Sequence, residues 1–155
     1  MPRRLLCAAV LFAAAGLAVA ADPIKLELKD FKCKAKGDGE NLVGYNDAEG
    51  KLFFYTFGTA TADVKIPADG EYTITVAASC DEALNEKAKF KLTVGDEVVA
   101  KEVALTDLGE KKYPVTAKLK KGDAKLVIEF LNDAYKENEH DRNLYVHSVT
   151  IEPKK

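Results

Sequence analysis

A polar segment near the C-terminus carries the side chains with the clearest potential for chemistry. Residues 132–143 read NDAYKENEHDRN and lie between two segments of alternating hydrophobicity, LVIEFL and LYVHSVTI. The carboxylates and amides of this loop are Asp133, Glu137, Glu139, Asp141, Asn132, Asn138 and Asn143. Carboxylates crowded in this way repel one another unless a cation or an arginine compensates them. Calcium takes oxygen ligands from carboxylates, amides and backbone carbonyls, so the loop supplies the ligand type of a calcium site.

The spacing of these acids is not that of an EF-hand, which needs acids at alternating positions and a central glycine. An exposed acidic loop that binds nothing would have the same composition, and this alternative stays open. A second polar loop, residues 37–50, reads GDGENLVGYNDAEG and is rich in glycine and acids. It is typical of an excursion between early strands, and it could form a second wall of the same site.

The sequence predicts that the elements flanking these loops are β-strands. Period-two alternation dominates, and turn signals such as Pro67-Ala68-Asp69-Gly70 and Gly95-Asp96 separate the alternating runs. A phase slip at Asp30 predicts a bulge in the first strand. Residues 81–87 (DEALNEK) have helical composition but are too few to be more than a connector. The expected strands are 24–35, 51–57, 61–66, 71–79, 88–94, 98–105, 113–119, 125–131 and 144–152. We therefore expect one all-β domain over residues 21–155, an antiparallel β-sandwich (jelly roll) of about nine strands.

The first twenty residues are expected to lie outside this fold. Arg3 and Arg4 precede an apolar run from Leu5, which ends in the small residues Ala18-Val19-Ala20. This is the layout of a secretory signal peptide, here residues 1–20, with cleavage after Ala20 or, alternatively, Ala21. No later segment is long and apolar enough to span a membrane. The sequence predicts an exported protein, secreted or in the periplasm or at the cell surface.

Composition excludes several classes of function. The chain of 155 residues is 47% hydrophobic and 31% charged, as expected of a globular domain, and its formal net charge of −2 argues against nucleic acid as a partner. Two His and three Cys leave little material for a zinc or redox-metal enzyme. After export Cys33 and Cys80 would remain, and whether they form a disulfide stays open. His147 shares the phase of Val149 and Ile151, which predicts a hydrogen-bonded histidine in the core.

The segment FLNDAYKENEHDRNLYVHSVTI resembles the C-terminal signature of the calcium-dependent xylan-binding modules. In that signature a strand ending in Asn-Asp leads through a variable loop to Asp-Arg-Asn-Leu and a final strand. The segments LELKDF and VKIPADGEYTITVAAS are similar to the first strand and to a central strand of the wider jelly-roll group of carbohydrate-binding modules.

The resemblance implies a Ca²⁺ ion that is held by the loop and coordinates vicinal hydroxyls of a polysaccharide, xylan or a related glycan. Asp133 and Asp141 are the matched carboxylates. The backbone carbonyl of Arg142 would be a further ligand, with Asn143 or Asn132 as amide support. The Arg142 side chain would act as a buttress that pairs with neighbouring acids.

The sugar contacts are less well specified, because such modules commonly place Trp beside the calcium and this chain has none. Tyr135 in the loop is the expected stacking residue and Tyr45 the second, because one face of a tyrosine ring is apolar and its hydroxyl can hydrogen-bond. Glu137 completes the expected ligand-binding set.

A catalytic constellation is not apparent in the sequence. Beyond residue 20 the only serines are Ser79 and Ser148, and neither lies in a G-x-S-x-G turn. Cys80 with His140 or His147 could imitate a thiol protease pair, but no flanking signature supports it. We therefore expect a non-catalytic binding module. The alternative is a structural or protein-interaction sandwich of the cell envelope, in which calcium only stabilises the loop or is absent.

Overall fold

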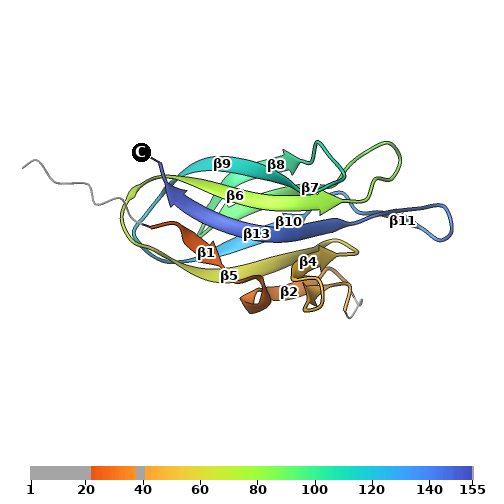
Figure 1. Ribbon diagram of the computed structural model, residues 1–155, viewed down its shortest axis with the longest axis horizontal. Helices are drawn as coiled ribbons and strands as arrows, with labels where there is room; N and C mark the ends of the chain where they lie inside the picture. The colour runs from red at the N-terminus through yellow and green to blue at the C-terminus, as the bar shows by residue number, and fades with distance from the viewer. Residues whose placement is uncertain (1–21, 38–40, 155) are drawn as a thin grey trace, which may run out of the picture.

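The computed structural model describes residues 22–37 and 41–154, so the expected signal peptide (residues 1–20) lies outside the described residues. These residues form thirteen strands and one short 3-10 helix (Figure 1). The elements are β1 (Ile24–Leu26), η1 (Leu28–Asp30), β2 (Lys32–Ala35), β3 (Val43–Asn46), β4 (Lys51–Phe54), β5 (Gly58–Ile66), β6 (Gly70–Cys80), β7 (Lys89–Val94), β8 (Glu97–Ala104), β9 (Lys111–Leu119), β10 (Gly122–Phe130), β11 (Ala134–Lys136), β12 (His140–Arg142) and β13 (Leu144–Pro153).

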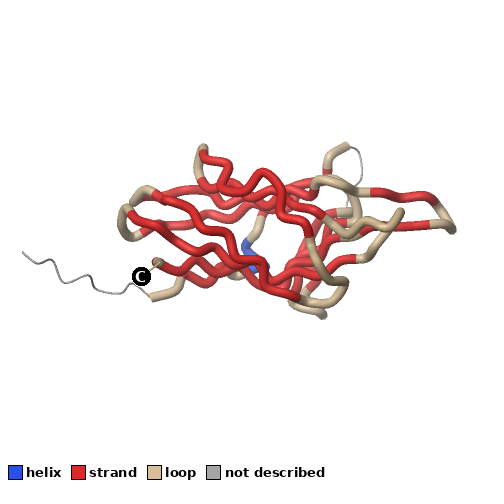
Figure 2. Tube along the Cα trace, turned by 90° about the horizontal axis from the view of Figure 1, so that it is seen from above, coloured by secondary structure: helices blue, strands red, loops and turns tan. Residues whose placement is uncertain are grey.

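Eleven of the strands build two antiparallel sheets that pack face to face, and β11 and β12 form a separate two-stranded sheet (Figures 1 and 2). The larger sheet has the order β3-β4-β13-β6-β9, with β1 also paired to β13, and the second has the order β2-β5-β10-β7-β8. The expected antiparallel β-sandwich is confirmed. Strands such as β5 and β10 alternate buried residues with more exposed ones, as a strand with one face on the core must.

The expected count of about nine strands is wrong. The predicted first strand is two strands, because the chain leaves the larger sheet at β1, turns through η1 and enters the other sheet at β2. The slip at Asp30 therefore marks a change of sheet and not a bulge. Both polar loops also contain strands: residues 37–50 include β3, and residues 132–143 include the hairpin β11–β12.

The core fills the space between the sheets with fully buried aliphatic and aromatic side chains. Phe54 of β4 meets Phe130 of β10 edge to face across it, with ring centroids 6.3 Å apart. Burial of this apolar surface is the main stabilising term of the fold. Cys33 lies on β2 and Cys80 at the end of β6, in different sheets, and both are free thiols. Within the described residues, no helix is long and apolar enough to cross a bilayer.

The strand register brings the longest connections to one end of the sandwich. Leu144, the first residue of β13, pairs with both Phe54 and Cys80, the last residues of β4 and β6. The hairpin β11–β12 projects from this end, opposite the C-terminus (Figure 1). The residues that follow β4 and β6 therefore meet those that precede β13.

Candidate metal and carbohydrate site

The hairpin β11–β12 sorts its side chains onto two faces. Its register pairs Ala134 with Arg142 and Tyr135 with Asp141. Continued by one residue, this register places Asp133 opposite Asn143, and neighbours two positions apart share a face. One face of the hairpin thus carries Asp133, Tyr135, Asp141 and Asn143. The register brings the two matched carboxylates to the same face.

Arg142 points to the other face and is 3% exposed. Its guanidinium donates to three backbone carbonyls: Glu86 at 2.9 Å, Ala83 and Asn132. The Glu86 carboxylate lies 3.7 Å away. The arginine therefore ties the base of the hairpin to residues 83–86 mainly through carbonyls, and to a lesser extent through an acid.

Asn132 is engaged in the same junction. Its side-chain oxygen accepts from the Lys89 amide at 2.7 Å, and its Nδ2 donates to the Lys87 carbonyl at 2.9 Å. Both polar groups of the side chain thus bind the backbone at the start of β7 and just before it. The structure places Asn132 in the scaffold beneath the hairpin, and not on the face that carries Asp133 and Asp141.

A cluster of acids surrounds Asn143, which is 5% exposed. Its Nδ2 donates to Asp141 Oδ2 and to Asp81 Oδ2, each at 3.0 Å. The Tyr145 hydroxyl donates to the same Asp81 oxygen at 2.8 Å. These bonds fix the orientation of the amide, so that its Oδ1 is the free end. Burial, followed by the bond to Asp81, raises the pKa of Tyr145.

Asp133 is held from another element. The Thr56 hydroxyl, between β4 and β5, donates to Asp133 Oδ2 at 3.1 Å. Burial raises the pKa of Asp133, the bond from Thr56 opposes this, and the negative charge of Asp141 raises it further. Among the described residues, Asp133 Oδ1 and Asn143 Oδ1 are buried and have no hydrogen-bond partner. A buried polar atom without a partner is destabilising.

These residues suit an oxygen-liganded cation. The donors are carboxylate and amide oxygens, which calcium prefers and zinc does not. Within the part of the chain that the structure describes, two buried acceptors lack partners, and the carboxylates of Asp133, Asp141 and Asp81 would offset a divalent charge. Within residues 22–37 and 41–154, no three acidic, His or Cys side chains are arranged as a ready metal site. The fit therefore relies on amide and backbone oxygens as well as on carboxylates.

The residues expected to contact sugar are dispersed. Tyr135 is 65% exposed on the same hairpin face as Asp141, and Glu137 is exposed in the turn of the hairpin. Tyr45 lies on β3, pairs with Leu52 of β4 and packs against the core. Because β3 is two strands away from β13, about 10 Å in a sheet, the structure does not bring Tyr45 to the hairpin.

Three aromatic residues lie beside the acidic cluster around Asn143 and were not predicted from the sequence. Phe53 and Tyr55 of the β4 segment are stacked with centroids 4.7 Å apart, and Tyr145 meets Tyr55 edge-on at 6.2 Å. Lys51 Nζ lies 4.3 Å from the Tyr145 ring centre. Tyr55 is 40% exposed in this group, and the Tyr145 hydroxyl is bonded to Asp81.

Asp81 was also missed, because residues 81–87 were expected to be a helical connector. They instead form a tight turn in which Ala83 and Glu86 exchange backbone hydrogen bonds, with Leu84 and Asn85 at positive φ. Asp81 reaches the site because β6 pairs with β13, a long-range register that no local pattern encodes.

The expectation of a core position for His147 is wrong. The register between β13 and β6 shifts between Val146 and Ser148, so the alternation restarts after the bulge. His147 is partly exposed, lies 2.7 Å from Ser79 Oγ through Nε2, and lies 3.6 Å from a Glu110 carboxylate oxygen. It belongs to the surface of the larger sheet.

Solved structures with a similar fold include several carbohydrate-binding modules. The CBM36-1 domain of a multidomain xylanase from the hindgut metagenome of Trinervitermes trinervoides has a TM-score of 0.63 and 11% identity, covering 86% of this chain and 99% of that one. A family 35 module from Clostridium thermocellum has a TM-score of 0.59 and 13% identity, with coverage of 84% and 98%. A CBM36 module in complex with calcium and xylotriose has a TM-score of 0.56 and 17% identity, with coverage of 86% and 100%. These likenesses show that the chain has the β-sandwich fold of such modules.

The sequence itself identifies the family. Residues 73–155, more than half of the chain, match the model of CBM60, the Ca-dependent xylan-binding carbohydrate-binding modules. The chain belongs to this family, as its C-terminal signature predicted. Comparison with curated proteins gave no match.

Proposed function

We propose that this chain is an exported, non-catalytic module that binds a xylan-like polysaccharide through a calcium ion held beside the hairpin β11–β12. The observation that carries the proposal is the pair of buried, unpartnered oxygens, Asp133 Oδ1 and Asn143 Oδ1, within a cluster of carboxylates. The family description, Ca-dependent and xylan-binding, supports it, as does the expected signal peptide at residues 1–20.

Asp133 and Asp141 would hold the ion, together with the Asn143 side-chain oxygen and the Arg142 carbonyl. The other residues of the site position these ligands. Thr56 orients Asp133. Asp81 accepts a hydrogen bond from the Asn143 side-chain NH₂ group, so the Asn143 side-chain oxygen points away from Asp81.

The Arg142 guanidinium fixes the base of the hairpin through the carbonyls it binds. When bound, calcium supplies open coordination positions that vicinal sugar hydroxyls can fill in place of water. Tyr135, exposed on the same face, offers the apolar side of its ring to the sugar.

The proposal is tested by affinity electrophoresis through gels that contain xylan, with calcium or with EDTA. The wild-type protein should be retarded only with calcium, and Asp141→Asn should migrate freely in both. Asp96→Asn, in the β7–β8 turn at the other end of the sandwich, is the matched control and should behave as wild type. Retardation that survives EDTA would refute the metal-bridged mechanism. Stabilisation by calcium without binding to any glycan would favour the structural role instead.

A further inference from the structure

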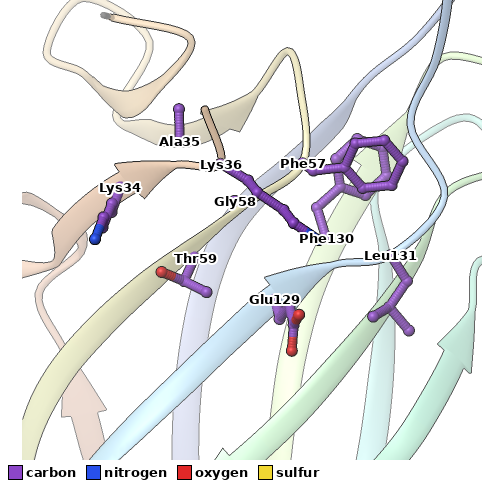
Figure 3. Close-up of a pocket in the computed structure, with 9 residues that line it drawn as sticks. All are labelled: Lys34, Ala35, Lys36, Phe57, Gly58, Thr59, Glu129, Phe130 and Leu131. Carbon is purple, nitrogen blue, oxygen red and sulfur yellow. The ribbon is translucent and has the colours of Figure 1, made fainter. Parts of the chain in front are cut away.

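A hollow lies next to the proposed site, on the outer face of the sheet β2-β5-β10-β7-β8. Its volume is about 310 Å³, at the lower end of the range for small-molecule sites. It is lined by Lys34, Lys36, Phe57, Thr59, Glu129 and Leu131, with Ala35, Gly58 and Phe130 behind them (Figure 3).

Strand register builds this hollow from two rows of side chains. Thr59 of β5 pairs with Lys34 of β2 on one side and with Glu129 of β10 on the other. Lys36, Phe57 and Leu131 lie just beyond the ends of these strands and complete the lining. The Lys36 amide donates to the Phe57 carbonyl at 2.7 Å, which extends the pairing of β2 and β5 to the rim.

The floor is rigid. A Cβ atom on Gly58 would lie 2.5 Å from the Lys34 carbonyl oxygen and 2.7 Å from the Val43 side chain, so only glycine fits between these strands. Below, Phe130 is buried, and the Phe57 ring packs against it with centroids 6.3 Å apart. The hollow is therefore part of the folded scaffold and not a gap between mobile loops.

The lining combines an aromatic wall with an excess of positive charge. Phe57 is 38% exposed. The Lys36 side chain extends across the hollow toward Phe57 and Phe130 (Figure 3). Glu129 is paired with Lys91 at 3.2 Å, whereas in the part of the chain that the structure describes neither Lys34 nor Lys36 forms an ion pair. Two lysines against one glutamate leave a net charge of about +1 on the lining at neutral pH, in a chain whose overall charge is −2.

The hollow adjoins the proposed calcium site, because residues that are neighbours in the sequence contribute to both. Phe57 directly follows Thr56, which donates to Asp133, and Leu131 precedes Asp133 by two residues. Consecutive Cα atoms are about 3.8 Å apart, so both rim residues begin within about 8 Å of the site residues. A polysaccharide chain held at Asp133 and Asp141 would have neighbouring sugars or side branches within reach of this hollow.

From this arrangement we infer that the hollow is a subsite for an acidic sugar, a uronic acid carried by the polysaccharide bound at the calcium site. The ring of the sugar would lie against Phe57, its hydroxyls would face Thr59 and Glu129, and its carboxylate would face Lys36 and Lys34. One carboxylate matches the excess charge of about +1 on the lining. This inference rests on the proposed function and narrows its ligand to glucuronate-bearing xylan.

The test compares two xylo-oligosaccharides of equal length, one neutral and one with a single glucuronic acid branch, by titration calorimetry in the presence of calcium. The wild type should bind the acidic ligand roughly fivefold more tightly, as expected for two solvent-exposed charge contacts. The double variant Lys34→Gln/Lys36→Gln should bind both ligands with the affinity that wild type has for the neutral one. Lys65→Gln is the control. It also removes one positive charge from a lysine, at the far end of β5, and it should keep the preference for the acidic oligosaccharide.

Two failures are distinguishable. Calcium-dependent binding of both ligands with equal affinity, or a preference that the double variant keeps, would overturn the acidic subsite and leave the proposed function intact. Loss of all binding to both ligands with calcium present would overturn the proposed function and the subsite with it. Lysine-dependent binding of the acidic ligand alone, in EDTA, would support the hollow and contradict the calcium mechanism.

Discussion

Replacing Asp133 by Asn should stabilise the calcium-free protein. The carboxylate is partly buried, lies near the charge of Asp141 and, among the described residues, has one buried oxygen without a hydrogen-bond partner. The asparagine removes the charge, keeps an oxygen to accept from Thr56, and adds an NH₂ group that can donate to Asp141. Relieving one poorly satisfied buried group is worth about 1 kcal/mol, or about 3–5 °C in the melting temperature of a domain of this size.

Calcium should reverse the order of the melting temperatures of wild type and Asp133→Asn. A ligand at one hundred times its dissociation constant stabilises the folded state by about 2.7 kcal/mol. Wild type gains this stabilisation, and Asp133→Asn, which lacks the charged ligand, does not. Wild type should therefore melt below the variant in EDTA and above it in saturating calcium. Asp96→Asn, away from the site, should melt with wild type in both buffers.

The same carboxylate sets a pH dependence. Because the pKa of Asp133 is raised above 3.8 in the folded state, the folded protein binds this proton more tightly than the unfolded chain. In EDTA, the contribution of protonated Asp133 to stability is complete below the ordinary pKa of the carboxyl group. This contribution is lost as pH rises through the raised pKa of the folded state. With calcium the sign inverts, since the ion needs the ionised carboxylate. Differential scanning fluorimetry over this pH range measures both trends. A variant less stable than wild type in EDTA, or equally stabilised by calcium, would refute the reasoning.

Three further predictions concern the surrounding structure. Arg142→Ala should lower the free energy of unfolding in urea by about 3 kcal/mol, because it leaves buried carbonyls without their donors; a loss below 1 kcal/mol would contradict its role as a tie. Tyr145 should stay protonated when other tyrosines ionise, since burial and Asp81 raise its pKa; wild type and Tyr145→Phe should then show the same ultraviolet absorbance change on titration to pH 11. Cys33 and Cys80 should both react with a thiol reagent in denaturant without prior reduction. Burial raises the pKa of Cys33 to about 11 and should keep it unreactive in the folded protein at pH 8; rapid labelling there would contradict this.

The sequence was sufficient to predict those parts of the fold that depend on local pattern. Strands such as β6 and β10 have one face on the core, so their side chains alternate and their positions follow from period two. The hairpin β11–β12 is short and polar, with most of its side chains exposed, so no hydrophobic alternation marks it. The split of the first strand depends on a change of sheet, which is a property of the whole fold.

The candidate site was predictable only in part for the same reason. Asp133 and Asp141 lie within one segment and share a face by hairpin register. Asp81 and Thr56 come from segments distant in sequence, and only the pairing of β6 and β4 with β13 brings them there. Tyr45 was expected within the polar loop of residues 37–50, whereas the structure places it on β3, at the edge of the larger sheet.

The most direct test of the central claim is thermodynamic linkage between calcium and sugar. Calcium is titrated into metal-free protein with and without a saturating xylo-oligosaccharide, and the oligosaccharide is titrated with and without calcium. If the ion bridges the Asp133–Asp141 hairpin and the sugar, each ligand must tighten the other by the same factor, well above one. A calcium affinity that is unchanged by bound sugar would contradict the account.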